Sequence, residues 1–198
     1  MLLVEGLDYG PPNRPPLRRG LSFSVSPGEL LHIVGPNGVG KSFLLSTLLG
    51  VHSKQAGNIQ LGFSRHRYLP QMQNKAAHLP YSLGDILHFE KFSLNGLEGI
   101  GLLNSAQADL AWNKASGGER QRTLLTRFFL QSGDLMVLDE PFNHLDLHSK
   151  ERVQNLIRET FSERPGSAAL LVSHDDDPSK WMGGVKVVTL DLAVEGAR

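Results

Sequence analysis

The run Gly35-Pro-Asn-Gly-Val-Gly-Lys-Ser42 decides how this chain folds, because it fits the phosphate-binding pattern G-x-x-x-x-G-K-[ST] at every fixed position. It follows the apolar run Leu30-Leu-His-Ile-Val34, which is typical of a buried parallel strand. After it, leucines recur at helical spacing as far as Leu49, and Gly50 offers a helix stop. A strand, a glycine-rich turn and a helix N-terminus direct backbone N–H groups at one point, so the sequence predicts an anion-binding loop.

This phosphate loop, residues 35–42, carries side chains suited to a nucleotide. Glycines at 38 and 40 would let the backbone approach phosphate groups without an intervening Cβ. We expect Lys41 to reach the β- and γ-phosphates and the Ser42 hydroxyl to ligate Mg²⁺. The alternative is a glycine-rich turn with an incidental lysine. The residues predicted to contact the nucleotide here are Gly35, Pro36, Asn37, Gly38, Val39, Gly40, Lys41, Ser42 and Phe43.

A carboxylate pair ends a second apolar run, Leu135-Met-Val-Leu-Asp-Glu140. Ligands of open α/β sheets bind where the parallel strands end, so both acids should face the same site as the phosphate loop. We expect Asp139 to hold Mg²⁺ and Glu140 to polarise the attacking water as a general base. Pro141 should end the strand. The alternative is a strand followed by two solvated acids.

A second glycine-rich run, Ala115-Ser-Gly-Gly-Glu-Arg-Gln-Arg122, stands between the phosphate loop and the carboxylate pair. With these motifs in this order, the chain resembles the nucleotide-binding subunits of ATP-binding cassette (ABC) transporters, from residue 3 to about residue 192. The resemblance implies an α/β fold: a P-loop NTPase core with an N-terminal antiparallel β lobe and a small helical (signature) subdomain at about residues 74–130. The 198 residues would form a single ABC ATPase domain.

The resemblance assigns roles to isolated residues as well. Tyr9 matches the aromatic residue that stacks on adenine. Gln71 matches the glutamine that contacts Mg²⁺ and the attacking water, with Gln73 as the less favoured alternative. His174, which follows the apolar run Ala168-Ala-Leu-Leu-Val172, matches the switch histidine that contacts the γ-phosphate. Catalysis would therefore rest on Glu140, His174, Lys41 and Gln71, and the metal would be held by Ser42, Gln71 and Asp139.

The signature residues Ser116, Gly117 and Gly118 open a predicted helix, whose N-terminus is a second anion site. One molecule cannot bring two helix N-termini on different lobes to one phosphate, but two molecules related by a two-fold axis can. The resemblance therefore implies a head-to-tail dimer of two copies around two ATP molecules. Asp146, in the run Asn143-His-Leu-Asp146, matches the key residue of the segment that crosses this interface.

The chain departs from the family pattern at three positions. Phe43 stands where threonine is usual, Ala115 where leucine is usual, and Phe142 where threonine or serine is common. None of these changes removes a group that would contact phosphate or metal. An inactive copy would be expected to have lost Lys41 or Glu140, and both are present.

Composition excludes several other classes of protein. The 20 basic and 20 acidic residues leave no net charge, which argues against a general nucleic-acid or membrane-surface binder. The absence of cysteine excludes disulfides and thiolate metal sites. No run approaches the length of a membrane span, and the start lacks the features of a signal peptide, so a cytoplasmic location is expected. The acidic run 175–177 should be solvated loop charge.

The function implied by the resemblance is an ATPase that joins two copies on binding ATP and releases them on hydrolysis, moving an integral membrane permease at the cytoplasmic face. The run Leu79-Pro-Tyr-Ser-Leu-Gly-Asp-Ile-Leu87 is similar to that of divalent-metal importers, which would add a solute-binding protein as partner. Tyr81, Leu83 or Phe89 could meet the permease or pack in the core. Alternatives are a small exporter or lipid-transport ATPase, and a soluble ABC-type switch, although switches usually carry long coiled-coil or zinc insertions.

Overall fold

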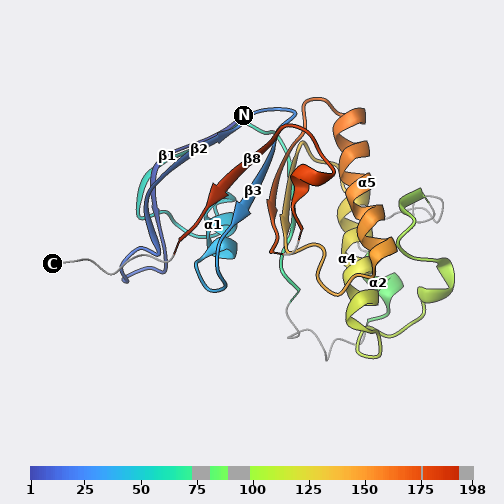
Figure 1. The fold of residues 1–198 in the computed structure, drawn as a ribbon. Coiled ribbons are helices and arrows are strands. Elements are labelled where there is room, and N and C mark those ends of the chain that lie inside the picture. Colours follow the sequence, from blue (N-terminus) through green and yellow to red (C-terminus); the bar gives the residue numbers. More distant parts are fainter. Residues whose placement is uncertain (73–80, 89–98, 175, 192–198) are drawn as a thin grey trace.

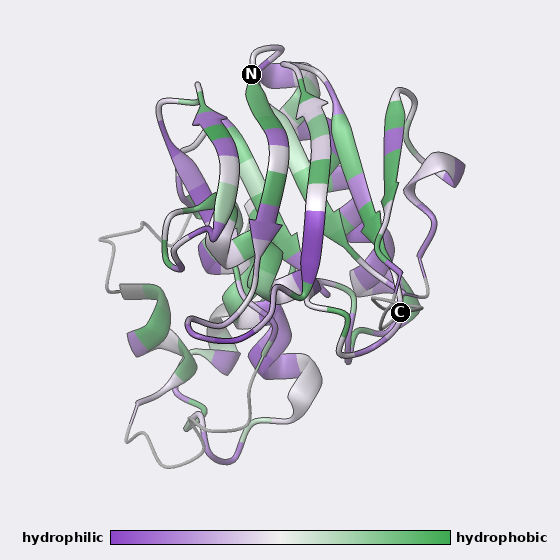
Figure 2. Ribbon diagram, turned by 90° about the vertical axis from the view of Figure 1, so that its left-hand side faces the viewer, coloured by the Kyte–Doolittle hydropathy of each residue, from purple (hydrophilic) through white to green (hydrophobic). Residues whose placement is uncertain are grey.

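Three antiparallel strands form the N-terminal part of the computed structural model, which describes residues 1–72, 81–88, 99–174 and 176–191 (Figure 1). They are β1 (Leu2–Tyr9), β2 (Arg18–Val25) and β4 (Ala56–Leu61), in the order β2-β1-β4. Leu2 of the central strand pairs with Val25 on one side and with Leu61 on the other. Hydrophobic and hydrophilic residues follow one another along these strands (Figure 2), as expected for a sheet with one buried face. The predicted antiparallel β lobe is confirmed.

Five parallel strands form the second sheet, in the order β5-β6-β7-β3-β8. Because all five are parallel, their carboxyl ends meet at one edge, which we call the carboxyl edge. The sequence motifs at residues 35–42, 139–140 and 174 therefore follow neighbouring strands at the same edge, as an α/β fold requires. The strands are β3 (Leu30–Val34), β5 (His66–Leu69), β6 (Leu135–Asp139), β7 (Ala168–Val172) and β8 (Val185–Thr189).

Alternate residues of the central strands face two separate cores. In β6, Leu135 and Val137 belong to one core, and Met136 and Leu138 to the other. The first core joins the parallel sheet to α1 (Lys41–Leu48) and the antiparallel lobe; the second joins it to α4 (Gly117–Leu130) and α5 (Leu147–Glu163). In Figure 1, α1 accordingly lies between the two sheets, with α4 and α5 on the far side of the parallel sheet. This layering holds the carboxyl edge rigidly from both faces.

The helical part of the chain agrees only in outline with the sequence interpretation. Within residues 74–130 the structure describes α2 (Leu83–His88), a 3₁₀ turn η2 (Ser105–Gln107) and α4; a second 3₁₀ turn, η3 (Pro178–Lys180), precedes β8. Leu83 is fully buried and Tyr81 is exposed, whereas Phe89 and Gln73 lie outside the described residues.

Among the helices in the part of the chain that the structure describes, none is both long enough and apolar enough to cross a bilayer. The longest of them, α5, is 17 residues long and buries only one side.

Candidate functional site

The phosphate loop joins β3 to α1 at the carboxyl edge, and its glycines adopt conformations that other residues rarely reach. Gly38 has φ 81° and Gly40, the N-cap of α1, has φ 99°. A Cβ on Gly35 would lie 2.3 Å from the carbonyl oxygen of Leu190. No side chain caps α1, and its first turn carries no acidic residue. The N–H groups that open α1 are therefore free of competing side chains, which suits an anion.

Lys41 is held back on the phosphate loop by its own backbone. Its ammonium group donates to the carbonyl oxygens of Gly35 at 2.7 Å and Pro36 at 3.0 Å, and lies 2.7 Å from Nε2 of His174. Burial lowers the pKa of Lys41, while Glu140 and Asp139 act in the opposite direction. All three N–H donors of the ammonium therefore have an acceptor in this arrangement.

Asp139 and Glu140 end β6 beside this lysine. Asp139 is buried, and neither oxygen of its carboxylate makes a hydrogen bond of good geometry with the described part of the chain, although the Ser42 hydroxyl is near enough to lower its pKa. Burial dominates and raises the pKa of both acids. A buried carboxylate without a hydrogen-bond partner is costly. An oxygen-seeking cation such as Mg²⁺ would satisfy it, so the residues present fit a magnesium ion.

His174 connects the acid and the lysine. Nε2 lies 3.4 Å from Oε1 of Glu140 and 2.7 Å from the ammonium of Lys41. An ammonium group only donates, so this ring nitrogen accepts and carries no proton in this arrangement. Glu140 itself has φ 52°, and its N–H donates to the carbonyl oxygen of Val172. The base candidate is thereby fixed to the strand that leads into His174.

A hollow of about 280 Å³ opens between these groups. It is lined by Asn37, Gly38, Gly40, Lys41, Ser42, Phe43, Gln71, Asp139 and Glu140. The structure therefore brings together most of the residues predicted for phosphate, metal and catalysis, Gln71 included.

The signature residues lie outside this hollow, at the start of α4. Ser116 and Glu119 form a capping box: Oγ of Ser116 accepts from the Glu119 N–H at 3.2 Å, and the Ser116 N–H donates to the Glu119 carboxylate at 2.8 Å. The hydroxyl also donates to that carboxylate at 2.7 Å. Asp146 caps α5, accepting from the Ser149 N–H at 2.7 Å. One chain thus contains the predicted residues in two separate groups.

The sequence interpretation gave no role to two residues near the signature run, His144 and Arg122. A Cβ on Gly117 would lie 3.3 Å from the His144 ring, and one on Gly118 would lie 2.9 Å from the His144 carbonyl oxygen. Arg122 also lies 3.5 Å from the Asp146 carboxylate. In the sequence, the adjacent glycines 117 and 118 were the available sign of such a contact, because glycine marks places where backbone segments approach closely.

The adenine-stacking role predicted for Tyr9 is wrong for this structure. The side chain is 0% exposed, because the alternation along β1 turns it into the core. Its ring stacks on Phe43, with centroids 6.4 Å apart, and Phe43 stacks on His52 at 4.3 Å. No face of the Tyr9 ring is left open to a base.

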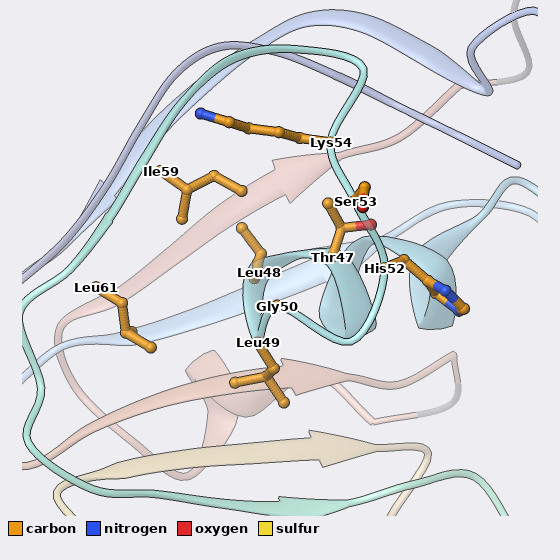
Figure 3. A pocket seen from close by; sticks show the side chains of 9 residues that line it. All are labelled: Thr47, Leu48, Leu49, Gly50, His52, Ser53, Lys54, Ile59 and Leu61. Atoms are coloured by element: carbon orange, nitrogen blue, oxygen red, sulfur yellow. The ribbon is translucent and has the colours of Figure 1, made fainter. Parts of the chain in front are cut away.

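A larger hollow of about 490 Å³ lies at the C-terminal end of α1 (Figure 3). Its lining is mostly apolar, including Leu48, Leu49, Ile59 and Leu61. Lys54, its one lysine, donates to the carbonyl oxygen of Gly57. It lacks the convergent acids and glycines of the site at the carboxyl edge, so the smaller hollow is the better candidate for chemistry.

Two curated proteins are similar in sequence to this chain. The zinc import ATP-binding protein ZnuC of Acinetobacter baylyi is 37% identical over 79% of the chain and 61% of its own length. The ATP-binding protein YdiF of Bacillus subtilis is 33% identical over 88% of the chain and 27% of its own length. The chain therefore spans less than two thirds of either curated relative.

A solved structure is also similar to this chain. This structure, described as an inward-facing conformation of a metal-chelate type ABC transporter, has a TM-score of 0.75 at 27% identity, covering 96% of this chain and 79% of that one. Residues 18–143, most of the chain, match the family described as ABC transporter. This chain belongs to the ABC transporter family.

Proposed function

We propose that this chain binds and hydrolyses ATP as the energy-coupling part of a divalent-metal importer, with zinc as the first cargo to test because of its ZnuC relative. The observation that carries the ATPase proposal is the convergence of Lys41, His174 and Glu140 at the uncapped N-terminus of α1. A cation, a neutral ring nitrogen and a buried acid within contact of one another suit phosphoryl transfer, which depends on positioned charge.

In the proposed reaction, the phosphate loop N–H groups hold the β- and γ-phosphates, and Lys41 exchanges its backbone carbonyl partners for phosphate oxygens. Glu140 polarises the attacking water, and His174 stabilises the charge on the γ-phosphate. Asp139, Ser42 and Gln71 would hold Mg²⁺, which supplies neutralising charge when bound. Phe43, rather than the buried Tyr9, is the aromatic residue that lines the hollow and is available to the nucleotide.

A second copy completes the proposed site. Ser116, Gly117 and Gly118 lie outside the hollow that contains Lys41, so a γ-phosphate could meet both groups only between two chains. A two-fold axis would then create two equal sites, with Asp146 near the interface. Hydrolysis removes a phosphate that both chains bind, so the closed dimer loses its differential affinity and opens.

The remaining partners follow from the proposed transport role. An integral membrane permease would receive the opening and closing motion, with the chain peripheral at the cytoplasmic face. A solute-binding protein would deliver the metal. Residues next to α2, including the exposed Tyr81, are the proposed point of contact with the permease.

Glu140→Gln tests the ATPase proposal. Loss of the base should slow turnover by about 10² to 10⁴-fold and leave an ATP-dependent dimer on size-exclusion chromatography. Glu163→Gln, an exposed change at the end of α5, is the matched control and should leave turnover unchanged. Wild-type turnover in Glu140→Gln would overturn the role of Glu140.

Metal import is tested separately, with the permease co-purified and placed in vesicles. We expect ATP-dependent uptake of zinc that Glu140→Gln abolishes. Equal uptake without ATP would exclude the energy-coupling role.

A second candidate is a nucleotide-driven switch that acts without a permease. The match over 88% of the chain to YdiF, which is named as an ATP-binding protein, favours it. Such a switch would hydrolyse ATP at the same rate with or without the permease, whereas a transporter subunit should be stimulated by it.

A further inference from the structure

Asp176 is buried, although the acidic run 175–177 was expected to be solvated loop charge. Its neighbour Asp177 is exposed, but Asp176 is only 7% exposed. Its carboxylate accepts hydrogen bonds from Trp181 Nε1 at 3.0 Å and Gln154 Nε2 at 3.1 Å, and forms an ion pair with Lys150 at 2.9 Å. A buried carboxylate with three donors from two segments, α5 and the turn at Trp181, is a built feature of the fold.

Phe142, which follows the carboxylate pair in the sequence, contacts two members of the same group. Its ring meets Trp181 edge-on, with centroids 6.4 Å apart, and the ammonium of Lys150 lies 5.6 Å from its centre. Phe142 stands two residues after Glu140. We call Phe142, Lys150, Gln154, Asp176 and Trp181 the Asp176 cluster.

The backbone of Asp176 extends the connection towards the phosphate loop. Its carbonyl oxygen accepts from the Ser173 hydroxyl at 2.7 Å. The Ser173 hydroxyl oxygen and carbonyl oxygen lie 3.0 and 3.2 Å from Nε2 of buried His32. His32 belongs to β3, which leads into the phosphate loop, and Ser173 immediately precedes His174.

Three segments of the candidate site are therefore linked to Asp176, α5 by its carboxylate, the residue before His174 by its backbone, and Phe142 through Lys150 and Trp181. Lys150 and Gln154 belong to α5, the helix that begins after Asp146. Phe142 follows Glu140, and the Asp176 backbone holds the residue before His174. None of the five side chains in the cluster lines the hollow of the phosphate loop.

We propose that Asp176 is a positioning residue: it fixes His174, Glu140 and the start of α5 relative to one another without touching the nucleotide. This inference rests on the proposed ATPase function. Misplacement of catalytic groups by about 1 Å can cost about 10²-fold in rate. Loss of the Asp176 carboxylate should therefore lower kcat while leaving ATP affinity, which depends on the phosphate loop, nearly intact.

The test uses the full chain with Trp112→Phe, so that Trp181 is the only tryptophan and its emission reports on the cluster. In this background Asp176→Ala should lower kcat by about 10- to 100-fold. The Kd of a fluorescent ATP analogue should stay within about twofold, and Trp181 emission should shift. Asp176→Asn keeps an oxygen that can accept from Trp181 and Gln154, so it should restore at least half of the turnover.

Glu159→Gln is the matched control, because it breaks the ion pair of Arg152 and Glu159 on the outer side of the same helix. It should change neither kcat nor emission. All rates are measured well below each variant's thermal midpoint, so that a loss of folded protein cannot imitate a loss of kcat.

Unchanged kcat in folded Asp176→Ala would overturn the proposal, as would a loss of ATP affinity equal to the loss of kcat. If the wild-type chain hydrolyses no ATP, the proposed function fails by itself. Positioning is then read from Trp181 emission on adding the ATP analogue: the change must be present in the Trp112→Phe chain and absent when Asp176→Ala is added to it, and any other result overturns it.

Discussion

The environment of Tyr9 in this chain differs from the one that the family resemblance implies. The side chain is fully buried, and its hydroxyl oxygen has no hydrogen-bond partner among the residues that the structure describes. Burial raises its pKa to about 12, with Arg18 acting in the opposite direction. The residue therefore stabilises the lobe through its ring, and its hydroxyl is a cost.

Tyr9→Phe should accordingly stabilise the protein by about 1–3 kcal/mol at neutral pH, measured by urea unfolding. The gain should grow above pH 10. The unfolded Tyr9 ionises near pH 10, whereas the folded one resists ionisation to about pH 12, so the wild type alone loses stability through this window. A large loss of stability in Tyr9→Phe at neutral pH would show that the hydroxyl has a partner.

Glu140 carries a prediction about the pH dependence of turnover. Burial raises the pKa of its carboxyl, and the charge of Lys41 and the backbone N–H of His174 only partly offset this. A general base acts in its ionised form, so kcat should fall as the pH drops through this raised pKa, above the ordinary glutamate value of about 4.3. The pH profile of kcat measures it. The residual rate of Glu140→Gln should lack this acidic limb; a limb retained there would assign it to another group.

At the scale of elements, the start of α4 depends on the absence of a side chain at Gly118. A Cβ there would lie 2.9 Å from the His144 carbonyl oxygen, which is backbone and cannot swing aside. Gly118→Ala should therefore destabilise the protein by about 1–3 kcal/mol, measured as a lower urea midpoint. Gly166→Ala is the control, because nothing lies within 4 Å of a Cβ at that glycine. Equal effects of the two changes would show that the loop at His144 moves freely.

The elements divide into those that the sequence could predict and those that it could not. The strands β3, β6 and β7 are continuous apolar runs, and burial on both faces explains why their pattern was decisive. Helix α5 was not predicted, although Asp146 caps it. Its buried side is narrow, centred on Val153, Leu156 and Ile157, so the apolar signal along its 17 residues is weak.

The same contrast holds inside the candidate site. Motif spacing was enough to predict that Lys41, Glu140 and His174 gather at one edge, since parallel strands end together. The cluster around Asp176 was beyond the sequence, because its members come from α5, the end of β6 and the turn before β8. Such contacts depend on the strand order β5-β6-β7-β3-β8, which no local pattern records.

At the scale of the whole molecule, the distribution of the two anion-binding groups bears on assembly. The uncapped N-terminus of α1 opens into the hollow with Lys41, whereas α4 begins elsewhere and is capped by its own Ser116 and Glu119. A phosphate joining these groups across two chains would have to displace the Glu119 carboxylate from Ser116. The capped state is therefore expected to be the open, unpaired one.

Mixing two inactive variants tests this shared site. Lys41→Met removes the phosphate-loop cation. Ser116→Asp keeps a good N-cap for α4 but places a carboxylate where phosphate would bind. Each variant alone should show almost no turnover. In a dimer of one copy of each, both defects fall in the same shared site, and the other site combines an intact Lys41 with an intact Ser116.

With random pairing, half of the dimers are mixed and each has one working site, so the mixture should recover about a quarter of wild-type turnover. Mixing each variant with Glu140→Gln is the control. With Ser116→Asp, both defects fall in one site of the mixed dimer and the other site is intact, so recovery should equal that of the test pair. With Lys41→Met, the two defects occupy different sites of the mixed dimer, so no site is intact and no recovery is expected. If the test pair recovers nothing while each variant binds as expected on its own, the site is complete within a single chain and the two-copy arrangement is wrong.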